Sequence, residues 1–137
     1  MVAKKKDGVP ARRDVIWIEC NPQAGRETPD LHPFLVLSPQ KFNARTSLVI
    51  GLPMTSAEYN ADNPFAVAAG KAKGKTGKTS KTSKTSFVLC HQPKSFDWRV
   101  RNAKPRPLRK LGTEPFAQAC AVLEQIMQLT APSAGTK

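Results

Sequence analysis

The stretch from Leu31 to Ser56 constrains the fold of this chain more than any other. It holds two short apolar segments, Phe34 to Leu37 and Ser47 to Leu52, with polar residues around Ser38–Pro39 and Asn43–Ala44 between them. Apolar runs of this length, bounded by turn residues, predict two buried β-strands joined by a polar turn. The stretch therefore predicts the frame of a β-sheet.

Polar side chains stand at the outer ends of these two strands. His32 precedes the first strand, and Thr55 and Ser56 follow the second. If the strands pair antiparallel, the start of one lies beside the end of the other. We therefore expect His32 near Thr55 and Ser56, at one end of a sheet, where the three side chains could form a reactive site.

The rest of the chain adds short strand candidates and a proline-rich segment. In Ser95 to Arg101, apolar Phe96, Trp98 and Val100 alternate with charged residues, which is typical of a half-buried strand. Two prolines make Lys104 to Lys110 a connection or an irregular sheet edge. The other predicted strands are Asp14 to Cys20, Phe65 to Ala68 and Phe87 to Cys90.

A terminal helix is predicted from Thr113, with Thr113 as the N-cap and Pro115 in the first turn. Its apolar residues recur at helical spacing and should pack on the core. They are Phe116, Ala119, Cys120, Leu123, Ile126 and Met127. The fold predicted is mainly β with a C-terminal α-helix, a small bent antiparallel sheet or barrel over residues 13–130, between a basic tail at 1–12 and a short tail at 131–137.

The charge of the chain points to a polyanionic partner. Lys and Arg number 22 against 10 Asp and Glu, a net charge of +12. Such an imbalance favours nucleic acid, then an acidic protein or a membrane surface, with solubility as the plain alternative. We expect a mobile loop at residues 71–86, rich in Lys, Thr and Ser, which is either a cationic arm or a tolerated insertion. Its two GKT triplets lack the glycine spacing of a phosphate-binding loop.

The cysteine count and the lack of long apolar runs bear on location. Cys20, Cys90 and Cys120 are far apart and have no CxxC spacing, which suits free thiols in a reducing compartment. Neither a signal peptide nor a membrane-spanning segment is expected. The sequence therefore predicts a cytoplasmic protein that does not associate with membranes.

Five segments in order carry a resemblance to a known family. They are DVIWIECNPQAGRE, HPFLVLSPQKFN, LVIGLPMTS, CHQPKSFDWRVR and a helix after LGTEPF. Together they resemble the MazF/PemK family of toxin endoribonucleases, from bacterial type II toxin–antitoxin modules, over about Arg13 to Leu129. The resemblance implies an SH3-like barrel of the MazF/PemK (CcdB-like) type, working as a homodimer. It also implies sequence-specific cleavage of single-stranded RNA, usually mRNA, without metal or cofactor, and inhibition by an acidic antitoxin. The RNA 2′-hydroxyl would attack the adjacent phosphate, leaving a 2′,3′-cyclic phosphate and a 5′-hydroxyl.

Two positions depart from the family pattern. His32 stands where the family normally has Arg, and His91 stands where it commonly has Asp, whereas Thr55 and Ser56 keep the usual pair. Because histidine exchanges protons near neutral pH, His32 and His91 form a hypothetical acid–base pair, with Thr55 and Ser56 holding the phosphate. The candidate RNA-binding cations are Arg26, Lys41, Arg99 and Arg101.

Other interpretations of these residues stay open. The site could have drifted, leaving a non-catalytic binder of RNA or antitoxin, or a relative that acts on a protein target as the gyrase-poisoning toxins do. Zinc held by His32, His91, Cys20 and Cys90 is a further alternative, but no pair of these residues has ligand spacing, so no metal site is predicted.

Overall fold

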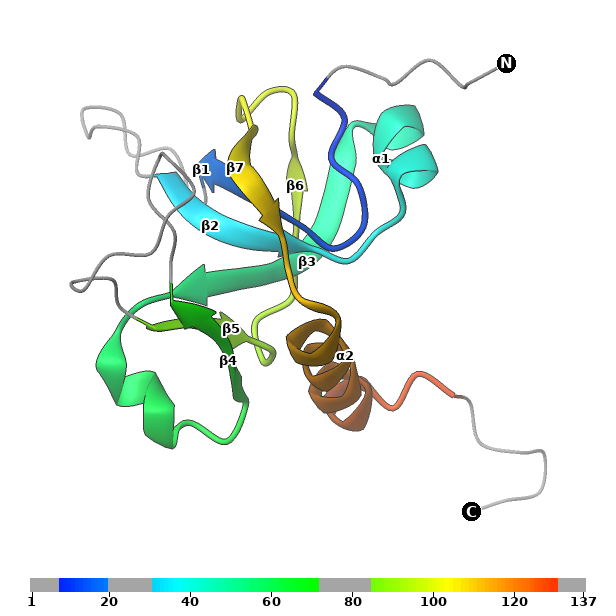
Figure 1. Cartoon of the computed structure of the whole chain (residues 1–137). Coiled ribbons are helices and arrows are strands. Elements are labelled where there is room, and N and C mark those ends of the chain that lie inside the picture. The colour runs from blue at the N-terminus through cyan, green and yellow to red at the C-terminus, as the bar shows by residue number, and fades with distance from the viewer. Residues whose placement is uncertain (1–7, 20–30, 72–84, 131–137) are drawn as a thin grey trace, which may run out of the picture.

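Strand β3 (Leu48–Thr55) lies at the centre of the sheet, because it pairs with three other strands. The computed structural model describes residues 8–19, 31–71 and 85–130 (Figure 1). Within them a seven-stranded sheet has the order β4-β5-β3-β2-β1-β7, and β6 also pairs with β3. The other strands are β1 (Asp14–Glu19), β2 (Leu31–Val36), β4 (Ala66–Lys71), β5 (Thr85–Leu89), β6 (Lys94–Asp97) and β7 (Lys104–Lys110).

The sheet is antiparallel and open. Every strand pairing in the described ranges is antiparallel. The strand order there has two ends, β4 and β7, so the sheet formed by these residues does not close on itself. The helices are α1 (Gln40–Thr46), a 3-10 turn η1 (Glu58–Asp62) and α2 (Thr113–Met127). The predicted class, mainly antiparallel β with a C-terminal helix, is confirmed. No helix in the described ranges is long and apolar enough to span a membrane.

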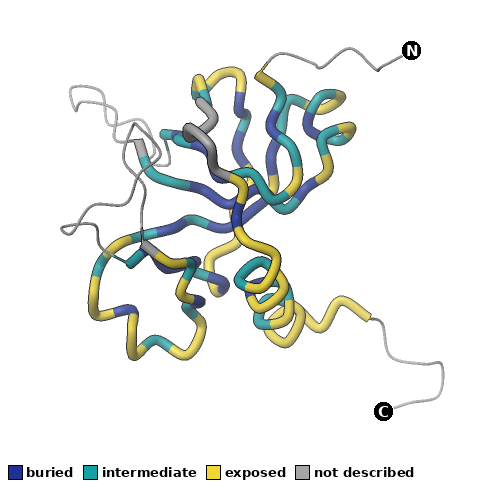
Figure 2. The backbone as a smooth tube through the Cα atoms, viewed as in Figure 1, coloured by how far each residue is buried: buried dark blue, intermediate teal, exposed yellow. Residues whose placement is uncertain are grey.

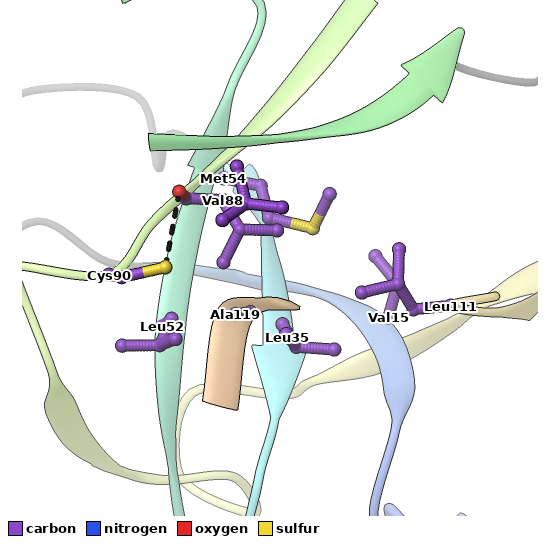
Figure 3. Close-up of a cluster of buried hydrophobic side chains, with 9 residues drawn as sticks. Val15, Leu35, Leu52, Met54, Val88, Cys90, Leu111 and Ala119 are labelled. Atoms are coloured by element: carbon purple, nitrogen blue, oxygen red, sulfur yellow. Dashed lines mark hydrogen bonds between the residues drawn. The ribbon is translucent and has the colours of Figure 1, made fainter. Parts of the chain in front are cut away.

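Two apolar clusters lie on opposite faces of the central strands. Neighbouring residues in a strand point to opposite faces, so Leu35 joins one cluster and Phe34 the other. The first cluster holds Val15, Leu35, Leu52, Met54, Val67, Val88, Cys90, Leu111 and Ala119, the last of these from α2 (Figure 3). The second holds Ile16, Ile18, Phe34, Val36, Val49, Phe96 and Trp98.

Gly51 lets β2 and β3 come together between these clusters. It pairs with Val36 on one side and with Lys94 on the other. A Cβ built on Gly51 would collide with the carbonyl oxygen of Leu35. Only glycine fits this close backbone approach.

The prediction of a polar turn between the two central strands is wrong, because residues 40–46 form helix α1. Asn43 holds the helix in place through its buried side chain. Its Nδ2 donates to the carbonyl oxygens of Pro10 (2.8 Å) and Ser38 (3.0 Å), and its Oδ1 accepts from the Ser38 hydroxyl. These contacts, and one from Gln40 to the Val9 carbonyl, tie residues 9 and 10 of the predicted basic tail to the domain.

The predicted strand from Ser95 to Arg101 ends at Asp97. The Asp97 carboxylate accepts hydrogen bonds from the backbone N–H groups of Arg99 (3.0 Å) and Val100 (2.9 Å), which turns the chain there. Val100 is therefore 82% exposed and not on the apolar face that alternation predicted. The irregular edge predicted for 104–110 is confirmed, since β7 ends the strand order and its register with β1 shifts.

The terminal helix is confirmed, but its details differ from prediction. Gly112, one residue before Thr113, is the N-cap, and no side chain caps this end. Ala119 is buried and Cys120 only half-buried, while Ile126 and Met127 are 40% and 47% exposed. The C-terminal end of α2 extends beyond the sheet, as Figure 2 shows, so these two residues of the predicted stripe reach no core. Most of the predicted loop at 71–86 lies outside the described residues, but Lys71 belongs to β4, and Thr85 and Ser86 belong to β5.

Candidate functional site

The start of β2 and the end of β3 lie at one edge of the sheet. The two strands pair antiparallel as predicted, with Phe34 opposite Pro53 and Leu35 opposite Leu52. Continuing that register by two residues sets His32 opposite Thr55. In Figure 1 the start of β2 and the end of β3 lie on the same side of the molecule. This edge is the candidate site.

His32 is held within the sheet and not on a loop. It pairs with Ile18 of β1, and strand alternation places its side chain on the face of Phe34 and Val36. The residue is partly buried and takes part in further contacts. A side chain set by pairing to a neighbouring strand is better oriented for chemistry than one on a free turn.

Thr55 and Ser56 lie where β3 leaves the sheet. Thr55 pairs with Phe87 of β5, and its Oγ1 accepts a hydrogen bond from the Ala57 N–H at 3.2 Å. The hydroxyl keeps its own proton to donate, which suits a contact with a phosphate oxygen. Ser56 is exposed. The following turn is fixed by the buried Asn60, whose N–H and side-chain amide both donate to the Ala57 carbonyl.

His91 lies apart from His32. It follows β5, four residues beyond the Phe87 that pairs with Thr55, and β5 runs antiparallel to β3. Its exposed ring contacts Phe65 with a centroid distance of 5.6 Å, and its Nε2 lies 3.2 Å from the Gln92 amide nitrogen. Its described contacts do not include His32. The sequence placed Phe65 in a strand only; the antiparallel pairing of β4 with β5, which sets Ala66 opposite Leu89, brings it beside His91.

Arg101 lies close to the His32 edge. Its Nη1 donates to the Glu19 carbonyl at 2.7 Å, and its guanidinium lies 4.7 Å from the centroid of the Phe96 ring. Glu19 pairs with Leu31, next to His32. The Phe96 ring in turn packs edge-on against Phe34, with the centroids 5.4 Å apart. Arg101 is thus the predicted RNA-binding cation that the fold brings nearest this edge among the described residues.

The other predicted cations do not join this edge. Arg99 donates from Nη1 to the Ser47 hydroxyl, at the start of β3, and Lys41 is exposed on α1. The eight residues of β3 separate this end from Thr55 by roughly 23 Å, at about 3.3 Å per residue. Arg26 lies outside the described residues.

Cys90 is a buried, neutral thiol and not a nucleophile. It is fully buried in the first cluster, and its Sγ donates to the Val88 carbonyl at 3.7 Å (Figure 3). Burial, with a smaller contribution from Cys120, raises the pKa of Cys90 to about 11. Cys20, the other thiol in the zinc alternative, lies outside the described residues. Across the described ranges no three His, Cys, Asp or Glu residues gather as a metal site.

Comparisons with known proteins agree on one family. The family model described as "PemK-like, MazF-like toxin of type II toxin-antitoxin system" matches residues 11–129. The chain is 30% identical to the endoribonuclease toxin MazF of Escherichia coli K12 over 96 residues, which cover 69% of this chain and 75% of that protein. It is 33% identical to the endoribonuclease PemK of Escherichia coli over 105 residues, covering 76% and 71%.

A solved structure shares the fold. The MazE-MazF crystal structure (form II) from Deinococcus radiodurans matches with a TM-score of 0.69 and 28% identity, covering 90% of this chain and 100% of that one. The range matched by the family model, residues 11–129, includes the sheet, α2 and the edge that holds His32 and Thr55.

Proposed function

The chain belongs to the family of PemK-like, MazF-like toxins of type II toxin–antitoxin systems, and we propose that it is an endoribonuclease that cleaves single-stranded RNA, mRNA above all, in the cytoplasm. Three observations support this. Its curated relatives are named endoribonucleases. Its net charge of +12 suits a polyanionic substrate. The observation that carries the proposal is the shared edge at which the start of β2 and the end of β3 lie together.

The reaction proposed is transesterification through the RNA itself, without metal. The 2′-oxygen attacks the adjacent phosphorus as a base removes its proton, and the bond from phosphorus to the 5′-oxygen breaks as an acid protonates that oxygen. The products are a 2′,3′-cyclic phosphate and a 5′-hydroxyl. This step needs a base, an acid and donors to the phosphate oxygens.

The residues of the edge fit these roles. His32 transfers a proton at its imidazole, and when protonated it also supplies the positive donor that the family Arg would provide. The Thr55 and Ser56 hydroxyls donate to the phosphate oxygens. Arg101 adds positive charge on the β1 side of His32, where its guanidinium is held on the Glu19 carbonyl.

His91 is proposed as the second proton-transfer group. In an in-line attack the entering and leaving oxygens lie on opposite sides of the phosphorus, so the base and the acid need not touch. The exposed ring of His91, in contact with Phe65, would act across the bound RNA.

We propose an acidic antitoxin and a second copy of the chain as protein partners. The family is defined by toxin–antitoxin systems, and an acidic polypeptide matches the net charge of +12. Three apolar side chains at the C-terminal end of α2 and just beyond it are solvent-exposed in this single chain, which suits a homodimer interface. They are Ile126 (40%), Met127 (47%) and Leu129 (67%). Sedimentation should give the mass of a dimer, and Met127→Glu should shift it towards the monomer.

The test of the proposed function is RNA cleavage by the purified protein in EDTA. We expect fragments that end in a 5′-hydroxyl, which a polynucleotide kinase labels directly, and a 2′,3′-cyclic phosphate at the other terminus. Thr55→Val, which keeps the side-chain shape and removes the hydroxyl, should lower the rate on the order of 10²-fold.

A non-catalytic binder is the second candidate, because both His32 and His91 replace residues typical of the family. RNA that is bound but left intact, with or without added divalent metal, would establish that alternative. Cleavage that appears only when metal is added would overturn the metal-independent chemistry.

A further inference from the structure

A second group of cations lies at the opposite end of β3 from Thr55. Lys41 and Arg45 are exposed on α1 and, being four residues apart, lie on one side of that helix. Arg99 belongs to the turn after β6, which lies next to the start of β3 (Figure 1). We call Lys41, Arg45 and Arg99 the α1–turn surface.

The turn is fixed to α1 by hydrogen bonds. The Trp98 indole N–H donates to the Asn43 carbonyl at 2.8 Å, and the Trp98 backbone N–H donates to the Ser47 carbonyl at 2.9 Å. Arg99 donates to the Ser47 hydroxyl, and its guanidinium lies 4.2 Å from the centroid of the Trp98 ring. A guanidinium already held in this way loses little freedom when it meets an anion.

No carboxylate neutralises the α1–turn surface among the described residues. The first turn of α1 contains no acidic residue. Asp97, the acid of the adjacent turn, has its Oδ1 occupied by the backbone N–H groups of Arg99 and Val100. Within the described part of the chain, the ion pair present joins Lys110 to Asp14, elsewhere on the molecule. Lys41, Arg45 and Arg99 thus form no ion pair with a described carboxylate.

We propose that the α1–turn surface binds backbone phosphates of the same RNA strand that is cut at the His32 edge. This inference rests on the proposed function. The two ends of β3 are roughly 23 Å apart at about 3.3 Å per residue, a span of about seven nucleotides at the 3.4 Å spacing of a stacked strand. The surface is therefore a second contact, which a long strand reaches and a short one does not. It contributes affinity and not sequence choice, because phosphates are common to every sequence.

The experiment compares two variants with the same change in net charge. Lys41→Gln/Arg45→Gln removes two cations from the surface, and Gln118→Glu/Ala121→Glu adds two anions on exposed positions of α2, away from the proposed dimer interface at its C-terminal end. Both lower the net charge by two. Arg99 is left unchanged, because it also holds the turn. The probes are 30-nucleotide and 6-nucleotide strands around one cleavage site, as RNA for cleavage and as uncleavable 2′-deoxy strands for binding over a range of salt.

The expected result is specific to strand length. Lys41→Gln/Arg45→Gln should weaken binding of the 30-nucleotide deoxy strand about tenfold and reduce the slope of log affinity against log salt by about 1.4, because two phosphate contacts are lost. It should leave cleavage of the 6-nucleotide RNA unchanged. The α2 variant should bind both strands like the parent, apart from a small effect common to both lengths.

If both variants weaken binding of the 30-nucleotide deoxy strand equally, the effect comes from net charge alone and the proposal is overturned. An unchanged salt slope in Lys41→Gln/Arg45→Gln would also overturn it. Poly-glutamate is a further binding probe. If Lys41→Gln/Arg45→Gln loses binding to poly-glutamate but binds the 30-nucleotide deoxy strand like the parent, the proposal is overturned in favour of an acidic polypeptide partner. If the parent protein cuts neither RNA, the proposed function fails. Binding of the deoxy strands still measures whether the α1–turn surface contacts phosphates. The two failures are therefore distinguishable.

Discussion

His32 lies opposite Ile18 in the ladder between β1 and β2, so strand pairing orients the proposed catalytic imidazole. The partner strand β3 brings Thr55 to the same edge through the register that joins Phe34 to Pro53. In the proposed assignment, His32 stands where the family normally has Arg. An arginine supplies charge at every working pH, whereas a histidine supplies charge only while protonated and can also move a proton. The exchange should therefore be visible in the pH dependence of cleavage.

Replacing His32 should remove proton transfer from the site. We expect His32→Ala to lower the cleavage rate by roughly 10²- to 10⁴-fold, the usual contribution of a general acid or base. His32→Arg should recover RNA binding, because the positive donor returns, but one limb of the parent's bell-shaped pH profile should disappear. The measurement is the rate on a long single-stranded RNA between pH 5 and pH 9. If the pH profile of His32→Arg keeps the bell shape of the parent, His32 acts only through its charge and does not transfer a proton.

His91 offers a separate test of the paired-histidine hypothesis. We expect His91→Ala to slow cleavage by on the order of 10²-fold, since the second proton transfer is lost. Phe65→Leu is the matched control: it removes the aromatic ring that contacts His91 and leaves the imidazole in place, so it should cost far less. Full activity in both His32→Ala and His91→Ala would rule out the pair.

The sequence predicts the site's frame better than its details, for physical reasons. Apolar runs bounded by turn residues locate β2 and β3, and antiparallel pairing then places His32 and Thr55 at one edge. Helix α1 is not predicted, because its seven residues are too few to show helical periodicity. The helix also depends on contacts with residues far away in the sequence. The side chain of its buried Asn43 donates a hydrogen bond to the Pro10 carbonyl, and the Asn43 carbonyl accepts one from the Trp98 indole N–H. Neither partner is near Asn43 in the sequence.

Strand alternation also fails where a single side chain redirects the backbone. The pattern from Ser95 to Arg101 is that of a strand, yet the Asp97 carboxylate captures two backbone N–H groups and ends it. The separation of His91 from His32 is a matter of register, since Phe87 and not His91 pairs with Thr55. Register between distant strands is set by the packed cores, which local patterns do not reveal.

The hydrogen bond from Trp98 to Asn43 should contribute measurably to stability. Trp98→Phe keeps most of the apolar side chain but leaves the Asn43 carbonyl without its indole donor. The carbonyl still accepts from the Ser47 N–H at 3.0 Å, so we expect the free energy of unfolding to fall by about 1 to 3 kcal/mol, for one lost buried hydrogen bond plus some lost packing. Chemical denaturation measures the change. Val100→Ala, at an exposed position of the same turn, is the control and should stay within about 0.5 kcal/mol of the parent.

Cys90 should make stability fall at alkaline pH. Its pKa rises from 9.0 to about 11 in the folded chain, chiefly because burial disfavours the thiolate and also because Cys120 is near. A raised pKa means that the folded state holds the proton more tightly than the unfolded state. The stabilisation is therefore complete below about pH 9 and is lost as pH rises through 11. A difference of two pKa units corresponds to about 2 to 3 kcal/mol.

The measurement is the free energy of unfolding of the parent and of Cys90→Ala between pH 7 and pH 11, under reducing conditions. The difference between the two proteins should be constant up to about pH 9 and then shrink by about 2 kcal/mol, because the variant has no thiol to ionise. Cys120→Ser is the control. It should keep most of the alkaline loss, since burial is the larger cause of the shift. A difference that stays constant to pH 11 would show that the Cys90 thiolate is accommodated in the folded protein.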